Sequence, residues 1–538
     1  MKNNFINLST ILTETANKFD EEACLKKNRL LKSLNNCALP INRSLLHYHD
    51  TLLFLCAFPN QPAIVNLAEK ELNRLSLHLK NADRGNKLLP ENEGLPYLNT
   101  VTRFTPDFLK WLTLHRDITV SFDSFYDSTI SLNELLNITL PTLLRSETTA
   151  GLSNEELLEV LKIKPRQYIR FLSSQMEQLN EMPFVKDLLM EKLNVYVKLL
   201  PKNLYFSRAY NRLPVKNIFY QQNLLKRFDH QQLFLESIPK ETLLNKQEKL
   251  QVIKVIKNSM ALTNRETDPV TFMQQDSLKL FTLERGINIA FYGMIPERQM
   301  PLESYVGFTL FKNGFPVSYG GAWIFGRVAR IGINIFETFR GGESGYIMCQ
   351  LLRTYKQVFK ISYFEVEPYQ YGLDNPDGIK TGAFWFYYRY GFRPVDKQLQ
   401  RLAKTEQEKI TTRMNYRSSE KTLLRFTESN MVLNMGKKIH VQVETIAVKL
   451  KSFLKDKYQN DYLTAEKDAI QLFCKQTGIH TDALNTDEKK ILSEVAFWVF
   501  SMNITNHIQL QRMKEMVHTK PRDLYAYQEL LLDFFEQE

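Results

Sequence analysis

Apolar residues recur with helical spacing along most of the first half of the chain. Residues 63–79 show the pattern most clearly, because Leu72, Leu75 and Leu79 fall on one face. Ser153 and Glu156 form a capping box before another apolar run. The same periodicity predicts helices over residues 8–19, 44–57, 131–140, 166–200 and 247–263. We therefore expect residues 1–265 to form a mainly helical region.

The period changes to two in the middle of the chain. Residues 286–293 and 305–311 alternate between apolar and polar positions, as strands do. Asn313-Gly314 follows shortly afterwards, and this pair favours a hairpin turn because both residues accept a positive φ at low cost. Residues 315–324 are expected to form the partner strand of this hairpin. The pattern predicts an antiparallel meander of strands.

Strand, turn and helix signals then follow each other at the spacing of an α/β domain. The series comprises a strand at 328–336, a glycine-rich turn at 340–345, a helix at 346–359, a strand at 361–366, an aromatic helix at 381–390 and a short strand at 391–395. A mixed sheet carrying helices is the expected product of such a series. We therefore predict an α/β domain over residues 270–395, flanked by helical regions on both sides.

The glycine-rich turn has a chemical use as well as a structural one. Gly341, Gly342 and Gly345 let backbone N–H groups approach a ligand, and the first turn of the following helix adds orphan donors and a positive dipole end. Such an arrangement suits a phosphate or pyrophosphate, to which Arg340 would add a cation. A plain strand-to-helix turn that needs glycine for its backbone angles is the alternative interpretation.

The order of these elements resembles the GNAT superfamily of acyl-CoA-dependent N-acyltransferases. That family carries a pyrophosphate loop patterned R/Q-x-x-G-x-G/A and a later helix patterned A-x-x-x-Y-x-x-x-G-F. Ala383, Tyr387, Gly391 and Phe392 match the helix pattern at each position. Two departures accompany the match. Glu343 stands where the loop usually has its first glycine, and Lys380 stands where an asparagine is common before the alanine.

The resemblance implies a set of site residues. Residues of the loop would hold the pyrophosphate of acetyl-CoA or another acyl-CoA, and these are Arg340, Gly341, Gly342, Ser344 and Gly345. Tyr387 would donate a proton to the departing CoA thiolate. Glu337 would be the base for the incoming amine, with Glu365 and Glu367 as competitors that share one face of the next strand.

Each of these groups also has a structural interpretation. Tyr387 lies in a run of aromatic residues, any of which is able to serve the core. Cys349, on the helix after the turn, is expected to be a small core residue and not a nucleophile. Tyr369, Gln370 and Tyr371, which precede a turn signal at 374–378, would line an acceptor cleft or belong to a structural loop, and the structural loop is favoured.

The chain changes character after residue 395. Residues 396–429 are rich in charged and amide side chains, which predicts a polar linker with a solvated helix. Apolar periodicity returns afterwards, so residues 430–538 are expected to form a C-terminal helical region that begins with a helix over 431–455. Gly478 is the expected C-cap of a later helix.

Composition narrows the class of protein. Across 538 residues, 70 Lys and Arg stand against 59 Asp and Glu, and the formal charge of +11 suits an anionic ligand such as CoA. The sequence contains no domain-sized block of basic residues, so it does not indicate binding to nucleic acid. The five cysteines are scattered and unpaired by spacing, which favours a reducing compartment. The sequence predicts neither a metal site, a signal peptide nor a membrane span, so a cytoplasmic location is expected.

Three functions remain open on the sequence alone. The first is acyl transfer from acyl-CoA to an amine of a large or unknown acceptor, such as a protein. The second is a non-catalytic scaffold that keeps the fold to bind a partner, because fold does not imply chemistry. The third is transfer from an aminoacyl-tRNA, the donor that some proteins with GNAT-like domains use.

Overall fold

The protein is described here by a computed structural model that covers residues 2–83, 90–147, 151–436 and 442–536. The chain divides into two compact units, each built from separate stretches of sequence. The first unit comprises Met1–Leu224, Asn245–Thr271 and Phe311–Pro316. The second comprises Leu225–Leu244, Phe272–Leu310 and Val317–Glu538. Each unit is described in turn.

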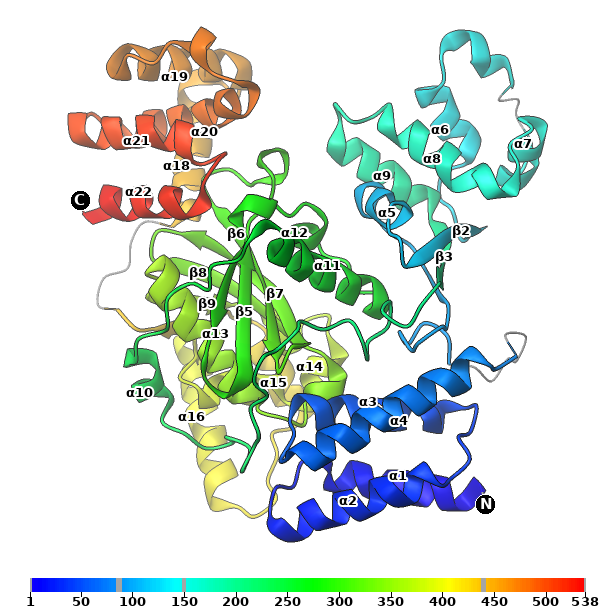
Figure 1. The fold of residues 1–538 in the computed structure, drawn as a ribbon. Helices are drawn as coiled ribbons and strands as arrows, with labels where there is room; N and C mark the ends of the chain where they lie inside the picture. The colour runs from blue at the N-terminus through cyan, green and yellow to red at the C-terminus, as the bar shows by residue number, and fades with distance from the viewer. Residues whose placement is uncertain (1, 84–89, 148–150, 437–441, 537–538) are drawn as a thin grey trace. The chain divides into compact units, whose positions relative to one another are not determined.

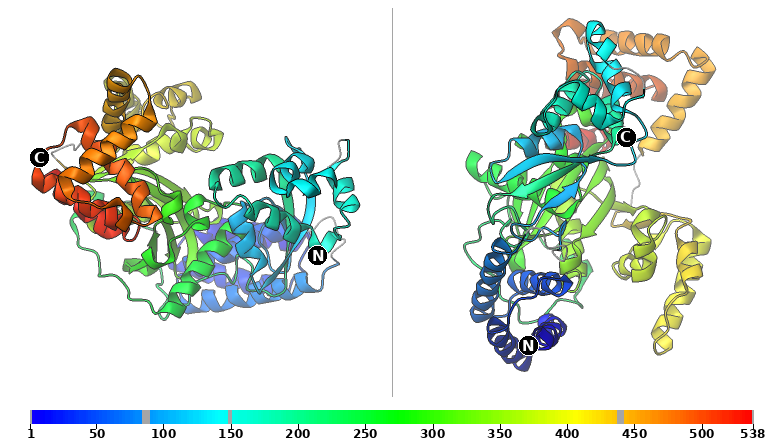
Figure 2. Two further views of the ribbon diagram at one scale, coloured as in Figure 1. Left: turned by 90° about the horizontal axis from the view of Figure 1, so that it is seen from above. Right: turned by 90° about the vertical axis from the view of Figure 1, so that its right-hand side faces the viewer.

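The first unit begins with four packed helices, drawn in blue in Figures 1 and 2. They are α1 (Lys2–Ala16), α2 (Glu21–Asn35), α3 (Arg43–Ala57) and α4 (Pro62–Lys80). The predicted leucine stripe of α4 is buried, with Leu72, Leu75 and Leu79 each at most 3% exposed. Asp20 and Asn42 cap the helices that follow them, because each side chain accepts a hydrogen bond from a first-turn amide.

A small sheet lies in the part of the chain that was expected to be mainly helical. Strands β1 (Thr100–Thr102), β3 (Val195–Pro201) and β2 (Ile118–Phe125) pair antiparallel in that order. The helices of this region are α5 (Pro106–Thr113), α6 (Leu132–Thr139), α7 (Asn154–Val160), α8 (Tyr168–Glu177) and α9 (Pro183–Leu193). The expectation of helix throughout 166–200 is wrong at its end. Residues from Val195 alternate between buried and half-buried, the period of a strand.

The remaining pieces of the first unit are two helices and a hairpin tip. Helix α11 (Lys246–Thr263) confirms the prediction for 247–263, and α12 (Asp268–Thr271) follows it. At the tip, Asn313 and Gly314 both have positive φ, so the predicted hairpin turn is confirmed. The Asn313 carboxamide donates to two backbone oxygens within the unit, those of Ala57 and Phe219, each at 3.0 Å.

The second unit is organised around an eight-stranded mixed sheet in the order β10-β11-β9-β8-β7-β6-β5-β4. The bounds are β4 (Lys279–Thr282), β5 (Ile287–Tyr292), β6 (Ser304–Lys312), β7 (Phe315–Phe325), β8 (Val328–Ile335), β9 (Tyr363–Val366), β10 (Arg393–Pro394) and β11 (Met431–Asn434). Strands β7 and β8 are antiparallel, whereas β8 and β9 are parallel. The predicted α/β class with a mixed sheet and flanking helices is confirmed.

The helix that follows β8 covers the sheet. In Figure 1, α13 (Ser344–Phe359) lies across the strands. Its Tyr355 is fully buried, stands 4.5 Å from the ring of Phe291 on β5, and donates to the backbone oxygen of Val306 on β6 at 2.8 Å. The parallel connection from β8 to β9 therefore runs through a helix packed on the sheet, as the sequence predicted.

Residues 396–429 form more regular structure than a polar linker. Helices α16 (Lys397–Thr412) and α17 (Glu420–Phe426) fill most of this stretch. Phe426 stacks on Phe384 with ring centroids 3.8 Å apart, which anchors α17 to the aromatic helix α15 (Ala383–Arg389). The predicted helix start at residue 431 is wrong, because Met431–Asn434 forms β11. Four residues are too few to separate the two periodicities, and pairing with β9 and β10 decided the outcome.

The chain ends in a five-helix bundle, drawn in orange and red in Figures 1 and 2. Its members are α18 (Val443–Tyr458), α19 (Tyr462–Thr477), α20 (Thr486–Met502), α21 (His507–Thr519) and α22 (Leu524–Glu536). Trp498 lies in its core at 2% exposure. Gly478 ends α19 with a positive φ of 69°, so the predicted C-cap is confirmed.

Candidate functional site

The predicted loop joins β8 to α13 and begins with a single 3-10 turn over Glu337–Phe339. Helix α13 starts at Ser344, and its N-cap residue Glu343 makes no side-chain cap hydrogen bond. The first-turn amides therefore keep the donor character and positive dipole end of an uncapped helix N-terminus. The Ser344 hydroxyl bonds the backbone oxygen of Arg340 at 3.1 Å and closes the loop on itself.

The carboxylate of Glu343 is buried and compensated. The residue is 1% exposed, and its Oε1 lies 2.5 Å from Nη2 of Arg285 and accepts the backbone N–H of Leu225 at 2.9 Å. A buried carboxylate with a guanidinium partner and an amide donor has its charge balanced locally. The departure from the family's loop pattern is thus accommodated by a partner that lies 58 residues earlier in the chain.

Gly345 is needed for packing. A Cβ at this position would overlap the hydroxyl and ring of Tyr390. Tyr390 is 5% exposed and also stacks on Phe228, with ring centroids 5.8 Å apart. The space over Gly345 is thus filled by the protein itself. Gly341 is exposed instead, and nothing lies within 4 Å of a Cβ built there.

Arg340 lies at the surface of the loop. Its Nη1 is 3.2 Å from Oδ2 of Asp377, and its Nε donates to the backbone oxygen of Ile335 at 3.3 Å. Roughly half of each charged side chain is exposed. An exposed ion pair of this kind contributes about 0–1 kcal/mol to stability. Breaking it so that the guanidinium binds another anion therefore costs little free energy. Asp377 is a neighbour that the sequence did not link to the loop.

Strands β8 and β9 separate beside this loop. Their parallel pairing runs from Val328↔Tyr363 to Arg330↔Glu365 and ends there within the described residues, although β8 continues to Ile335. The carboxyl-end half of β8 therefore pairs with β7 on one side, whereas its edge toward β9 has no strand partner within the described residues; this edge is called the opening between β8 and β9. The carboxamide of Gln370 fills part of this opening, because its Oε1 accepts the backbone N–H of Ile333 at 3.3 Å.

Tyr387 reaches the same opening from α15. Its hydroxyl donates to Oε1 of Gln370 at 3.4 Å. The ring packs against Phe386 and Phe392, each with centroids 5.5 Å away, and the residue is 4% exposed. Burial raises the pKa of the Tyr387 phenol well above its ordinary range, so the group carries its proton at neutral pH.

The candidate bases lie in different surroundings. Glu337 is exposed in the 3-10 turn, and its backbone oxygen accepts the N–H of Arg340. Glu365 is half-buried on β9 and accepts from Nδ2 of Asn430 at 2.5 Å. Phe364 and Val366 are buried, so Glu365 points to the other face of β9. Glu367 lies after the end of the strand, at the N-cap of the 3-10 turn Pro368–Tyr371, so the predicted shared strand face does not extend to it.

A hollow on the same face of the sheet contains polar groups that sequence reasoning missed. Glu303, Trp323, Arg330 and Glu365 lie among its lining residues. Arg330 bonds Glu303 at 3.0 Å and also pairs with Glu444 at the start of α18. Burial raises the pKa of the Glu303 carboxyl, an effect that Arg330 opposes. No local motif marks Glu303, because its partners come from β8 and α18.

Cys349 belongs to the core. The residue is fully buried on α13, and burial raises the pKa of its thiol, so the nucleophilic thiolate is disfavoured. Among the residues that the structure covers, no group of three His, Cys, Asp or Glu side chains is arranged to hold a metal ion. In the same part of the chain, no helix has the length and apolar character that crossing a bilayer requires.

Comparison with protein families, with curated proteins and with solved structures found no match for this chain.

Proposed function

We propose that the sheet of the second unit, with the loop at 340–345 and helix α15, transfers an acyl group from acyl-CoA to an amine. The observation that carries the proposal is the opening between β8 and β9. A protonated tyrosine reaches it from one side, and the uncapped N-terminus of α13 follows the strand that borders it. Antiparallel strands that lead into strand, loop, helix and a parallel strand also agree with the GNAT resemblance.

The proposed chemistry balances without a cofactor beyond the acyl donor. The amine nitrogen forms a bond to the thioester carbonyl carbon, and the carbon–sulfur bond breaks with its electron pair on sulfur. Tyr387 gives its proton to the thiolate, and the amine loses a proton to a carboxylate. The carboxyl group then releases this proton to solvent and the tyrosinate takes one up from solvent, so both groups return to their starting states. Glu337 is the first candidate for that carboxylate, and Glu365 is the alternative on β9.

The loop at 340–345 would bind the pyrophosphate of the acyl donor. Arg340 and the exposed backbone at Gly341 would meet the pyrophosphate, and Gly342, Ser344 and Gly345 would shape the loop around it. Glu343 does not oppose this role, because its charge is paired with Arg285 away from the exposed edge. The pair between Arg340 and Asp377 has to open for a phosphate to bind.

Isothermal titration of the full chain with acetyl-CoA and with longer acyl-CoAs tests the proposal. Gly341→Asp adds a carboxylate at an open position, and Gly341→Asn adds the same volume without charge. A unit charge about 4 Å from a phosphate costs about 1–4 kcal/mol, so Gly341→Asp should weaken binding by about fivefold or more. Gly341→Asn should bind acyl-CoA nearly as tightly as the wild type does. Gly345→Asp is a poor probe, because any side chain there meets Tyr390.

The alternatives give different outcomes in the same series. Binding of charged tRNA without binding of any acyl-CoA would move the protein to the aminoacyl-tRNA-dependent class. Binding of neither donor would leave a GNAT-like scaffold that acts through a partner. Acyl-CoA binding with equal affinities for the two Gly341 variants would remove the loop from the proposed site.

A further inference from the structure

Gln370 forms hydrogen bonds to two elements, β8 and α15. It lies in the 3-10 turn Pro368–Tyr371 directly after β9. Its Oε1 accepts from the Ile333 N–H of β8 at 3.3 Å and from the Tyr387 hydroxyl of α15 at 3.4 Å. Its Nε2 would stand 3.2 Å from a Cβ at Gly332, so the absence of a side chain there gives the carboxamide its place on β8.

The orientation of this carboxamide follows from its partners. A backbone N–H is only a donor, so the atom that faces Ile333 has to be the oxygen. The Tyr387 hydroxyl then donates to the same oxygen, and Nε2 is left on the opposite side, toward Gly332. The hydroxyl of Tyr387 is therefore fixed by a neutral acceptor that bonds β8 at the same time.

We propose that Gln370 is a positioning residue for Tyr387. Its carboxamide oxygen holds the phenol O–H at the opening between β8 and β9, and the O–H exchanges this hydrogen bond for one to the sulfur of the acyl donor. This inference rests on the proposed function. Both hydrogen bonds, at 3.3 and 3.4 Å, are longer than is usual for their type and therefore weak, so they exchange readily for those of an entering ligand. When the thioester enters, the Tyr387 O–H turns from the carboxamide oxygen to the sulfur, and the Ile333 N–H becomes available to the donor.

Two substitutions separate the parts of this role. Gln370→Met keeps the length of the side chain and removes its hydrogen bonds. Gln370→Glu keeps an oxygen acceptor and adds a charge. Gln407→Met is the matched control, because Gln407 is an exposed amide on α16. We expect Gln370→Met to lower kcat by about 3- to 10-fold, the worth of one neutral hydrogen bond, while the Kd for acetyl-CoA does not rise.

A spectroscopic arm reports on Tyr387 without turnover. The full chain would carry 3-fluorotyrosine at position 387, and fluorine NMR would follow its titration with pH. A hydrogen bond from the neutral phenol favours the protonated form, so Gln370→Met should lower the titration midpoint relative to the wild type. Gln370→Glu should raise it, because a neighbouring carboxylate disfavours the phenolate. Gln407→Met should leave it unchanged.

The outcomes are distinct. Turnover by the wild type together with equal midpoints in wild type and Gln370→Met, or equal kcat values, would overturn the inference and leave the proposed function intact. A rise in Kd equal to the fall in kcat would assign Gln370 to binding and overturn its positioning role. Absence of turnover with every acyl-CoA would overturn the proposed function, and with it the handover to sulfur, whatever the midpoints show.

Discussion

Three tyrosines near the end of α15 differ in role although they are close in sequence. Tyr387 faces the opening beside β8 and bonds Gln370. Tyr388 packs beneath the guanidinium of Arg393, whose carbon lies 3.8 Å from the ring centroid. Tyr390 fills the space over Gly345. Of these three tyrosines, Tyr387 is the one whose hydroxyl bonds Gln370 beside β8.

Replacement of Tyr387 by Phe should slow acyl transfer without loss of the fold. The change removes the proton donor and keeps the packed ring, and loss of a positioned general acid lowers the chemical step by about 10²–10⁴-fold. The dissociation constant for acetyl-CoA and the urea midpoint should stay close to wild type. Tyr388→Phe is the control and should keep full turnover. Equal kcat in Tyr387→Phe and wild type would exclude Tyr387 as the acid.

Lys257 of α11 is a buried cation in the first unit. It is 9% exposed, donates to the backbone oxygen of Thr271 at 3.3 Å, and lies 5.3 Å from the ring centroid of Trp111. Desolvation by burial lowers its pKa from the ordinary 10.5 to about 8, and Glu266 only partly opposes that effect. The folded state consequently releases this proton at a lower pH than the unfolded state does.

The free energy of unfolding of the wild type should therefore include a pH-dependent contribution from Lys257 that the Lys257→Met variant lacks. Between pH 8 and pH 10.5 the unfolded chain holds a proton that the folded chain has released. The free energy of unfolding therefore increases as pH rises through this window. The total gain is about 3 kcal/mol. Urea unfolding of both proteins below pH 8 and at pH 10.5 measures it as a change in their difference. A pH-independent difference would contradict the assignment.

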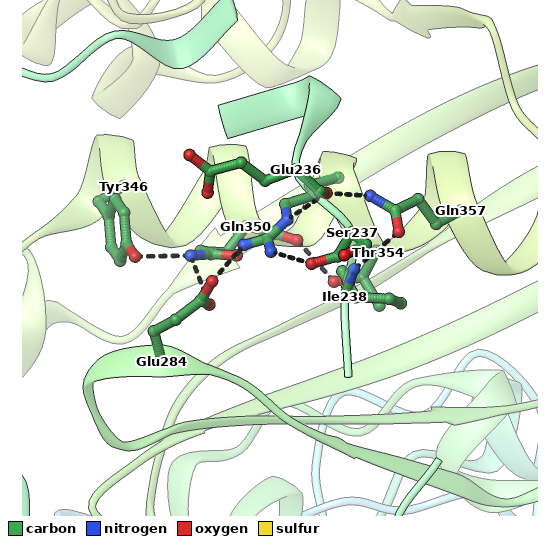
Figure 3. A network of polar contacts seen from close by, with 9 residues as sticks. Glu236, Ser237, Ile238, Glu284, Tyr346, Gln350, Thr354 and Gln357 are labelled. Carbon is green, nitrogen blue, oxygen red and sulfur yellow. Dashed lines mark hydrogen bonds and ion pairs between the residues drawn. The ribbon is translucent and has the colours of Figure 1, made fainter. Parts of the chain in front are cut away.

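At the scale of elements, α13 is fixed by a buried polar network. The guanidinium of Arg353 donates to the backbone oxygens of Glu236 and Ser237 at 3.0 and 2.6 Å, and to Glu284 at 2.7 Å. Figure 3 draws these residues with Gln350 and Tyr346, which extend the network along the helix. Arg353 is 1% exposed. The network ties the segment around residue 236 to the helix that carries the candidate loop.

Arg353→Met should destabilise the second unit by about 2–4 kcal/mol, because it removes the hydrogen bonds to the backbone oxygens of Glu236 and Ser237, to Glu284 and to Gln350. Lys356→Met is the graded control, since Lys356 makes a single bond, to the backbone oxygen of Phe234 at 3.0 Å. Its cost should be about 1 kcal/mol. Urea unfolding gives both values, and hydrogen exchange should show loss of protection at residues 234–238. Equal costs in the two variants would refute the network's special contribution.

At the scale of the whole molecule, the units are not continuous in sequence. The sequence predicted that the α/β domain begins near residues 265–270. Leu225–Leu244 lies before that boundary but belongs to the second unit. A fragment that begins at residue 270 would lack the two backbone acceptors of Arg353, those of Glu236 and Ser237. Domain boundaries drawn from composition miss such a segment, because its contacts are made more than a hundred residues later.

A pair of fragments tests this division. Residues 225–538 retain the segment at 225–244, and residues 245–538 differ only by its loss. We expect the longer fragment to unfold at a higher urea concentration, because Arg353 keeps both carbonyl partners. Arg353→Met should lower the midpoint of the longer fragment and change that of the shorter one much less. An equal effect in both would show that the segment contributes nothing through Arg353.

The sequence by itself determined many of the local elements and indicated one candidate catalytic residue, although it missed strands such as β3 and β11. Helix faces, capping boxes and the Asn313-Gly314 turn depend on residues within a few positions of each other, so their periodicity and chemistry suffice. The α/β class followed from the same local signals. Tyr387 was indicated by its place in a short motif, and the structure directs its hydroxyl to the β8–β9 opening.

Only the tertiary structure decided which side chains meet. Arg285 compensates Glu343, Tyr390 occupies the space over Gly345, and Gln370 reaches β8. Strand β11 likewise exists because β9 and β10 pair with it. These contacts join residues that are distant in sequence, and no local pattern encodes them. A contact of that kind is fixed by how the chain closes on itself, so it enters only with the fold.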